Sequence, residues 1–181
     1  MIHDPKILDY LGGITPIPFS GEVFRATRKS LDPLTFSTSG GRWSTKGGVA
    51  ALYTSLDRDG AIAEISFHWN QLNPKPTKPA LVHQLRVKAH QTLRILPADL
   101  NSLGVIVDRY AEINYIQTAQ IGAAIAFLGY DGLLAPSARW PCENLILFND
   151  SQHLSDELDV ISTQEVDWIS WERTAGRLAD D

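Results

Sequence analysis

The chain has 181 residues, of which 44% are hydrophobic and 20% charged, and these proportions exclude a disordered protein. Its length suits a single domain that buries its own core without a disulfide or a metal. The formal net charge of −5 argues against a general nucleic-acid binder, and the single cysteine, Cys142, excludes both an internal disulfide and a cysteine-rich zinc site.

Residues 1–20 are predicted to form an N-terminal arm, because a short amphipathic stretch is followed by paired glycines and two prolines. The core is expected to begin with a strand over 21–27, where alternate side chains point to opposite faces. A glycine-rich loop over 37–48 follows, in which two glycine pairs flank RWSTK, and VAALYTS at 49–55 is predicted to be the next strand.

Two helices are predicted in the rest of the chain. Residues 55–72 are apolar on nearly every side, with Ser55 or Asp57 as the N-cap, and 109–128 form the clearest helix, with Gly129 at its left-handed C-terminal end. Strands gathered around two helices, without regular βαβ alternation, predict an α+β fold with an antiparallel or mixed sheet. The remaining predicted strands are 80–89, 92–97, 130–139, 143–149 and 158–163.

Charge is unevenly distributed along the chain. From residue 151 onward the chain has eight acidic residues and two arginines, so this acidic tail carries a net charge of −6. Residues 21–50 are locally basic and form a candidate anion site, although a solvated basic face is the alternative explanation. We expect the acidic tail to lie outside any anion site and to be docked by Trp168 and Trp171 on the core or on a partner.

Several known catalytic and binding motifs are missing. No apolar run has membrane-spanning length and the first residues, MIHDPKILDY, do not resemble a secretion signal, so we expect a cytoplasmic protein. The glycines around Lys46 are in the wrong order for a phosphate loop, and the five histidines show no metal-binding spacing, so no metal site is expected. Ser137 lacks the G-x-S-x-G elbow and nothing local favours a thiolate at Cys142, which disfavours a serine or cysteine hydrolase.

A set of polar residues on predicted strands and on the first helix is left as the candidate site. Glu64 stands out, because a carboxylate in a helix that is apolar on most sides is costly to bury without a partner. The alternative is an ordinary exposed glutamate opposite the apolar stripe of the helix. The set comprises Arg25, Arg42, Tyr53, Glu64, Ser137 and Asn144.

These residues occur in an ordered series of short motifs. Phe24-Arg25 comes first, and GGRWS, LYTS, Glu64, YDGLLAPSAR and NLILF follow in that order. The series resembles the RES domain, the toxin half of bacterial RES–Xre toxin–antitoxin pairs, and the resemblance covers about residues 21–150. Ser44 stands where many relatives have asparagine. The chain is therefore interpreted as a single RES-like domain over 1–181, with the arm and the acidic tail as extensions of the 21–150 core.

The resemblance implies a fold and a reaction. The fold would be related to ADP-ribosyltransferase toxins, with two packed, mostly antiparallel sheets and flanking helices. The reaction would cleave the nicotinamide–ribose bond of NAD and pass ADP-ribose to water, to phosphate or to a protein such as phosphoribosyl pyrophosphate synthetase. NAD would be a substrate, with no permanently bound cofactor. The implied partners are an Xre-like antitoxin with a helix-turn-helix region and a second copy of the chain in a homodimer.

By matching motif positions, Arg25, Glu64 and Ser137 would be the family's Arg, Glu and Ser. Guanidinium groups suit the diphosphate of NAD, so Arg25 and Arg42 are expected to bind it. The ring face of Tyr53 is expected to lie against the cationic nicotinamide ring, and Asn144 is a further expected NAD-binding residue. Glu64 would stabilise the oxocarbenium-like state, and Ser137 is expected to be a hydrogen-bond partner because no neighbouring base activates it. The alternative is a non-catalytic module that binds NAD or a partner on the same scaffold.

Overall fold

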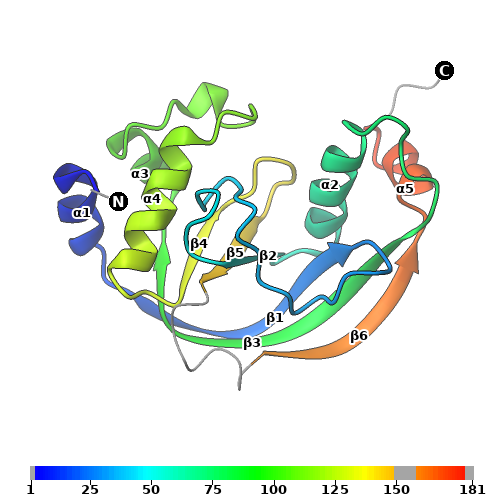
Figure 1. The fold of residues 1–181 in the computed structure, drawn as a ribbon, viewed down its shortest axis with the longest axis horizontal. Coiled ribbons are helices and arrows are strands. Elements are labelled where there is room, and N and C mark those ends of the chain that lie inside the picture. The colour runs from blue at the N-terminus through cyan, green and yellow to red at the C-terminus, as the bar shows by residue number, and fades with distance from the viewer. Residues whose placement is uncertain (1–2, 149–157, 178–181) are drawn as a thin grey trace.

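The computed structural model describes residues 3–148 and 158–177 and shows a mixed α+β protein (Figure 1). Helices gather above two ends of a strongly curved set of strands. In chain order the elements are α1 (Pro5–Gly12), β1 (Ile17–Thr27), β2 (Ala51–Ser55), α2 (Arg58–Trp69), β3 (Ala80–Arg94), α3 (Pro97–Ser102), the short 3-10 helix η1 (Val107–Arg109), α4 (Ile116–Phe127), β4 (Gly132–Pro136), β5 (Glu143–Phe148), β6 (Leu158–Val166) and α5 (Trp168–Thr174).

The long strand β3 organises the sheet. Most of its length pairs antiparallel with β1 on one side and β6 on the other, and its last residues, 92–94, pair parallel with β4. The antiparallel series continues through β5 to β2, which returns to β1 at the single pair Phe24 and Ser55. The prediction of two separate strands over 80–89 and 92–97 is therefore wrong, because one continuous strand serves both groups of partners.

Strands β2, β4 and β5 are buried on both faces, which explains their nearly unbroken apolar sequences. Leu133, Ile146 and Phe148 lie in a core shared with α1, α3 and α4. Their chain neighbours Leu134 and Leu147 point the other way, into a second core with β1 and β3. These three strands therefore form a middle layer between a layer of helices and the layer of β1, β3 and β6.

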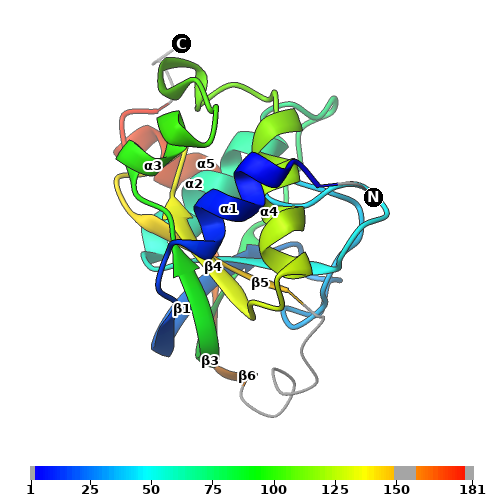
Figure 2. The same ribbon diagram turned by 90° about the vertical axis from the view of Figure 1, so that its left-hand side faces the viewer.

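The N-terminal residues belong to the core. Helix α1 lies against α4 over the middle layer (Figure 2), and its residues Ile7 and Leu11 are buried. Strand β1 begins at Ile17, inside the region predicted to be an arm. The described part of the predicted N-terminal arm therefore packs on the core, because Ile7 and Leu11 lie in the same apolar cluster as residues of α4.

Helix α4 is shorter than predicted. It begins at Ile116 and not at 109, and it buries its small residues Ala119, Gly122 and Ala124. A side chain at Gly122 would overlap the carbonyl of Trp43, so this glycine allows the glycine-rich loop to pack against the helix. Gly129 adopts the predicted left-handed conformation, with φ of 83°, just after the helix ends.

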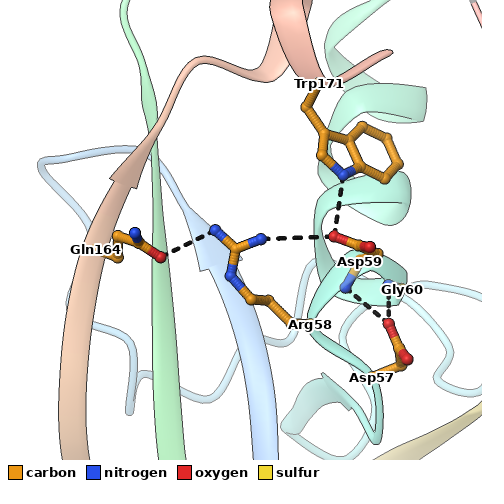
Figure 3. Close-up of polar contacts among 6 residues, drawn as sticks. All are labelled: Asp57, Arg58, Asp59, Gly60, Gln164 and Trp171. Atoms are coloured by element: carbon orange, nitrogen blue, oxygen red, sulfur yellow. Dashed lines mark hydrogen bonds and ion pairs between the residues drawn. The ribbon is translucent and has the colours of Figure 1, made fainter. Parts of the chain in front are cut away.

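The described part of the acidic tail docks on the core. Strand β6 pairs with β3, and α5 packs on α2 through an edge-to-face contact of Trp168 with Trp69. Figure 3 shows the indole of Trp171 donating to Asp59 at the start of α2, while Arg58 reaches Gln164 of β6. The predicted docking by Trp168 and Trp171 is therefore observed, and it occurs on the core. The rest of the predicted tail, at 151–157 and 178–181, lies outside the described residues.

Within residues 3–148 and 158–177, no helix combines the length and the apolar character that crossing a membrane requires. In the same residues, no group of three or more histidine, cysteine, aspartate or glutamate side chains is placed to hold a metal ion.

Candidate active site

A cavity of about 340 Å³ opens where α2, β1, β2 and the glycine-rich loop meet. Five of the six predicted site residues line it, and the sixth, Ser137, is hydrogen-bonded to one of them. The residues that line the cavity are Phe24, Arg25, Ala26, Gly40, Gly41, Arg42, Trp43, Tyr53, Thr54, Ala61, Glu64, Ile65, His68, Tyr115 and Asn144.

Glu64 reaches the cavity from the second turn of α2. The helix begins where predicted, at the Asp57 cap, whose carboxylate accepts the backbone N–H groups of Asp59 and Gly60 (Figure 3). The Oε1 atom of Glu64 accepts two hydrogen bonds of 3.0 Å, from the Ser137 hydroxyl and from the Asn144 amide. The carboxylate is half-buried and held in one orientation, which excludes the alternative of an ordinary exposed glutamate.

Ser137 is a fixed hydrogen-bond donor. It follows β4 directly, and its backbone N–H donates to the Cys142 carbonyl at 2.9 Å. Its hydroxyl oxygen accepts the backbone N–H groups of Arg139 and Trp140, at 3.1 and 3.3 Å, while its proton points to Glu64. Burial raises the pKa of the Cys142 thiol, so a thiolate nucleophile is disfavoured at this turn.

Arg25 is a half-buried cation without a carboxylate within ion-pair distance among residues 3–148 and 158–177. The observed hydrogen bond of its guanidinium goes to the Thr35 carbonyl at 3.3 Å. Burial lowers the pKa of Arg25 to about 10, against the opposing effect of Asp32, so the group is still charged at neutral pH. A desolvated guanidinium that lacks a carboxylate partner favours binding of an anion in the cavity.

Arg42 lines the same cavity, but its hydrogen bonds go to another part of the chain. Its guanidinium donates to the carbonyls of Tyr110 and Glu112 and lies 4.6 Å from the ring centroids of both Tyr110 and Tyr115. Arg42 therefore holds the segment between η1 and α4 against the cavity. The sequence predicted that Arg42 binds an anion. The structure shows in addition that Arg42 anchors the segment between η1 and α4.

Tyr53 fixes the glycine-rich loop to β2. Its hydroxyl accepts the Trp43 backbone N–H at 2.9 Å and lies 2.9 Å from the Ser44 hydroxyl. Burial raises the pKa of Tyr53 to about 12, so the phenol is neutral. A Cβ atom at Gly41 would come within 2.7 Å of this hydroxyl, which explains why glycine stands there.

The cavity residues that the sequence analysis did not single out include His68 and Tyr115. His68 follows Glu64 by four positions, and this spacing alone places both side chains on one face of a helix. Tyr115 comes from an irregular segment that the sequence assigned to a helix, so no local pattern pointed to it. Both residues add aromatic surface next to the charged groups.

Comparisons with known proteins agree with the fold. The family model of the RES domain matches residues 22–169, which extends beyond the expected boundary near 150. A chain of the crystal structure of the M. tuberculosis MbcT–MbcA toxin–antitoxin complex superposes with a TM-score of 0.79 at 16% sequence identity, covering 94% of this chain and 97% of that chain. No curated protein sequence is significantly similar to this one.

Proposed function

The chain belongs to the RES domain family, and on that premise we propose that it is a toxin that cleaves the nicotinamide–ribose bond of NAD. The observation that carries the proposal is the pairing of two groups in one cavity. Arg25 supplies a half-buried cation without a carboxylate partner among the described residues, and Glu64 supplies a carboxylate oriented by Ser137 and Asn144. A dinucleotide with an anionic diphosphate and a ribose that becomes cationic matches both groups.

Arg25 acts in binding. Its guanidinium pairs with diphosphate oxygens of NAD, an interaction strengthened by the partial exclusion of water from the cavity. Arg42 is held beside the cavity by Tyr110 and Tyr115, and it adds positive electrostatic potential to the cavity that Arg25 lines. The ring face of Tyr53 provides a surface for the cationic nicotinamide ring.

Glu64 acts in the chemical step. As the bond from nicotinamide to ribose C1′ breaks, positive charge develops on the ribose, and a fixed carboxylate stabilises it. The bonds from Ser137 and Asn144 keep the carboxylate in place, so it does not need to reorient during the reaction. Nicotinamide leaves as a neutral ring, so its departure needs no general acid.

The wider biological proposal concerns acceptors and partners. ADP-ribose passes to water, to phosphate or to a protein such as phosphoribosyl pyrophosphate synthetase, on a scaffold related to ADP-ribosyltransferase toxins. The structurally similar chain comes from a toxin–antitoxin complex, which supports a cognate antitoxin for this protein. We include an Xre-like antitoxin with a helix-turn-helix region, a homodimer and a cytoplasmic location in the proposal.

The test is incubation of the purified protein with NAD, with and without phosphate and with and without cell extract, followed by resolution of every product that contains ADP-ribose. Release of nicotinamide together with free ADP-ribose, its phosphate ester or a modified protein supports the proposal and identifies the acceptor. NAD binding without any nicotinamide release, under all of these conditions, would show instead a non-catalytic binding module.

A further inference from the structure

His68 lies in the cavity one helical turn after Glu64. Both side chains project from the same face of α2, and both line the cavity. The imidazole ring packs edge-on against Phe67, with ring centroids 5.5 Å apart. Neither ring nitrogen makes a hydrogen bond to another residue within 3–148 and 158–177, so the ring is available to a bound molecule.

The charged groups around His68 come from three parts of the fold. Glu64 lies on the same helix, Arg42 on the glycine-rich loop, and Arg139 on the turn after β4. Burial lowers the pKa of His68, and the two arginines act in the same direction, while Glu64 opposes them. The imidazole is therefore neutral at neutral pH and is able to accept a proton.

The proposed reaction needs such a group for some acceptors only. Water or a hydroxyl group must lose a proton as its oxygen bonds to C1′ of the ribose. A phosphate dianion attacks through an oxygen that already carries charge and needs no base. Glu64 already accepts two hydrogen bonds on Oε1 and is assigned to the developing positive charge, which leaves His68 as a separate proton acceptor in the cavity.

We propose that His68 is the general base for acceptors that carry a proton, an inference that rests on the proposed NAD cleavage. The bond from C1′ to the nicotinamide nitrogen breaks and its electron pair leaves with nicotinamide. The acceptor oxygen bonds to C1′, and the acceptor's proton passes to a ring nitrogen of His68 and then to solvent. His68 thereby sets how well water or a hydroxyl competes with phosphate for the ADP-ribosyl group.

The experiment compares two acceptors in one variant. His68→Asn should lower hydrolysis of NAD by about a hundredfold or more, in the range of a lost general base. Transfer to phosphate at saturating phosphate should change only a few-fold. His90→Asn, the same change at an exposed histidine of β3 outside the cavity, is the matched control and should leave both rates unchanged.

The pH dependence of hydrolysis gives a second measurement that does not depend on phosphate. In the parent, kcat/KM for hydrolysis should fall as the pH drops through the lowered pKa of His68, and this acid limb should be absent from His68→Asn. NAD affinity, measured by calorimetry, verifies that the variant is folded and binds substrate.

The outcomes separate this inference from the proposed function. A parent protein that releases no nicotinamide with either acceptor contradicts the proposed function, and this inference with it. An active parent whose His68→Asn variant hydrolyses NAD normally, or loses both reactions equally with an unchanged acid limb, contradicts only the role of His68.

Discussion

The hydroxyl of Ser137 donates a 3.0 Å hydrogen bond to Glu64, although 73 positions separate the two residues in the chain. The contact joins the turn after β4 to the middle of α2. The amide of Asn144 donates to the same oxygen from β5. Residues of three elements thus meet at one carboxylate. In Glu64→Gln, the side-chain carbonyl oxygen is able to accept the same two hydrogen bonds.

Glu64→Gln should therefore separate charge from shape. We expect turnover of NAD to fall by roughly a hundredfold or more, because the fixed negative charge beside the ribose is lost. NAD affinity should stay the same or improve, since the charge acts mainly as the transition state forms. Nicotinamide release and calorimetric NAD binding measure the two effects. A variant that turns over NAD like the parent would make Glu64 an ordinary helix residue.

Arg25→Ala should weaken the binding of NAD. Removal of a guanidinium that pairs with a desolvated phosphate costs about 2–5 kcal/mol of binding free energy. The matched control is Arg28→Ala, an exposed arginine just beyond the end of the same strand and outside the cavity, which should bind NAD like the parent. Equal affinities of the parent and Arg25→Ala in calorimetry would remove Arg25 from the NAD site.

Expression in a bacterial cell should be harmful because the cell loses NAD or an essential target is modified. Glu64→Gln, expressed to the same level, should be tolerated, and co-expression of a cognate helix-turn-helix antitoxin should relieve the harm. Relief is expected by occlusion of the cavity, where Arg25 and Arg42 favour a carboxylate-bearing segment of the antitoxin. Cell growth, intracellular NAD and the amount of folded protein are the measurements. Normal growth with abundant folded protein argues strongly against the toxin assignment.

The C-terminal residues should contribute to stability and not to catalysis. Among the described residues, removal of everything after Gly176 takes away two hydrogen bonds of Arg177, from its side chain to the Arg139 carbonyl and from its backbone N–H to the Glu172 carbonyl. Nicotinamide release should be nearly intact. Trp168→Ala should instead lower the free energy of unfolding by about 3–5 kcal/mol, because this indole is only 2% exposed and packs on Trp69. Urea unfolding and the activity of both variants test the two statements. A folded, truncated protein without activity would contradict the first.

His83 should make stability depend on pH. It is 3% exposed and lies between the hydroxyls of Thr27 and Thr163, at 2.9 and 2.8 Å. Burial and the charge of Arg25 lower the pKa of His83, so the unfolded chain binds the proton more readily than the folded one. The stabilisation is therefore complete above the unfolded value of about 6.5 and is lost as the pH falls below it.

Denaturant unfolding at a series of pH values from about 7 to about 5 measures this effect. His83→Gln should unfold with a weaker dependence on pH than the parent over this range. The other titrating groups, His68 included, are common to both proteins and cancel in the comparison. Identical slopes for the two proteins would contradict the assignment to His83.

Much of the fold follows from local sequence. Asp57 caps α2 and Gly129 ends α4 because their side-chain and backbone preferences act within one turn. The continuous apolar sequences of β4 and β5 correctly predicted strands, and the ordered motifs correctly indicated the RES family. Such features need no distant partner to be recognised.

Tertiary packing decided the rest. Helix α2 is apolar on nearly every side, so the sequence could not determine whether Glu64 points to solvent or to Ser137, and only the packing of β4 and β5 beside the helix settles this. The guanidinium of Arg42 reaches a carbonyl 70 positions away, and α5 docks on α2 through a contact between residues 112 positions apart. Contacts between distant segments depend on how the whole chain closes, whereas periodicity and capping depend only on neighbours in sequence.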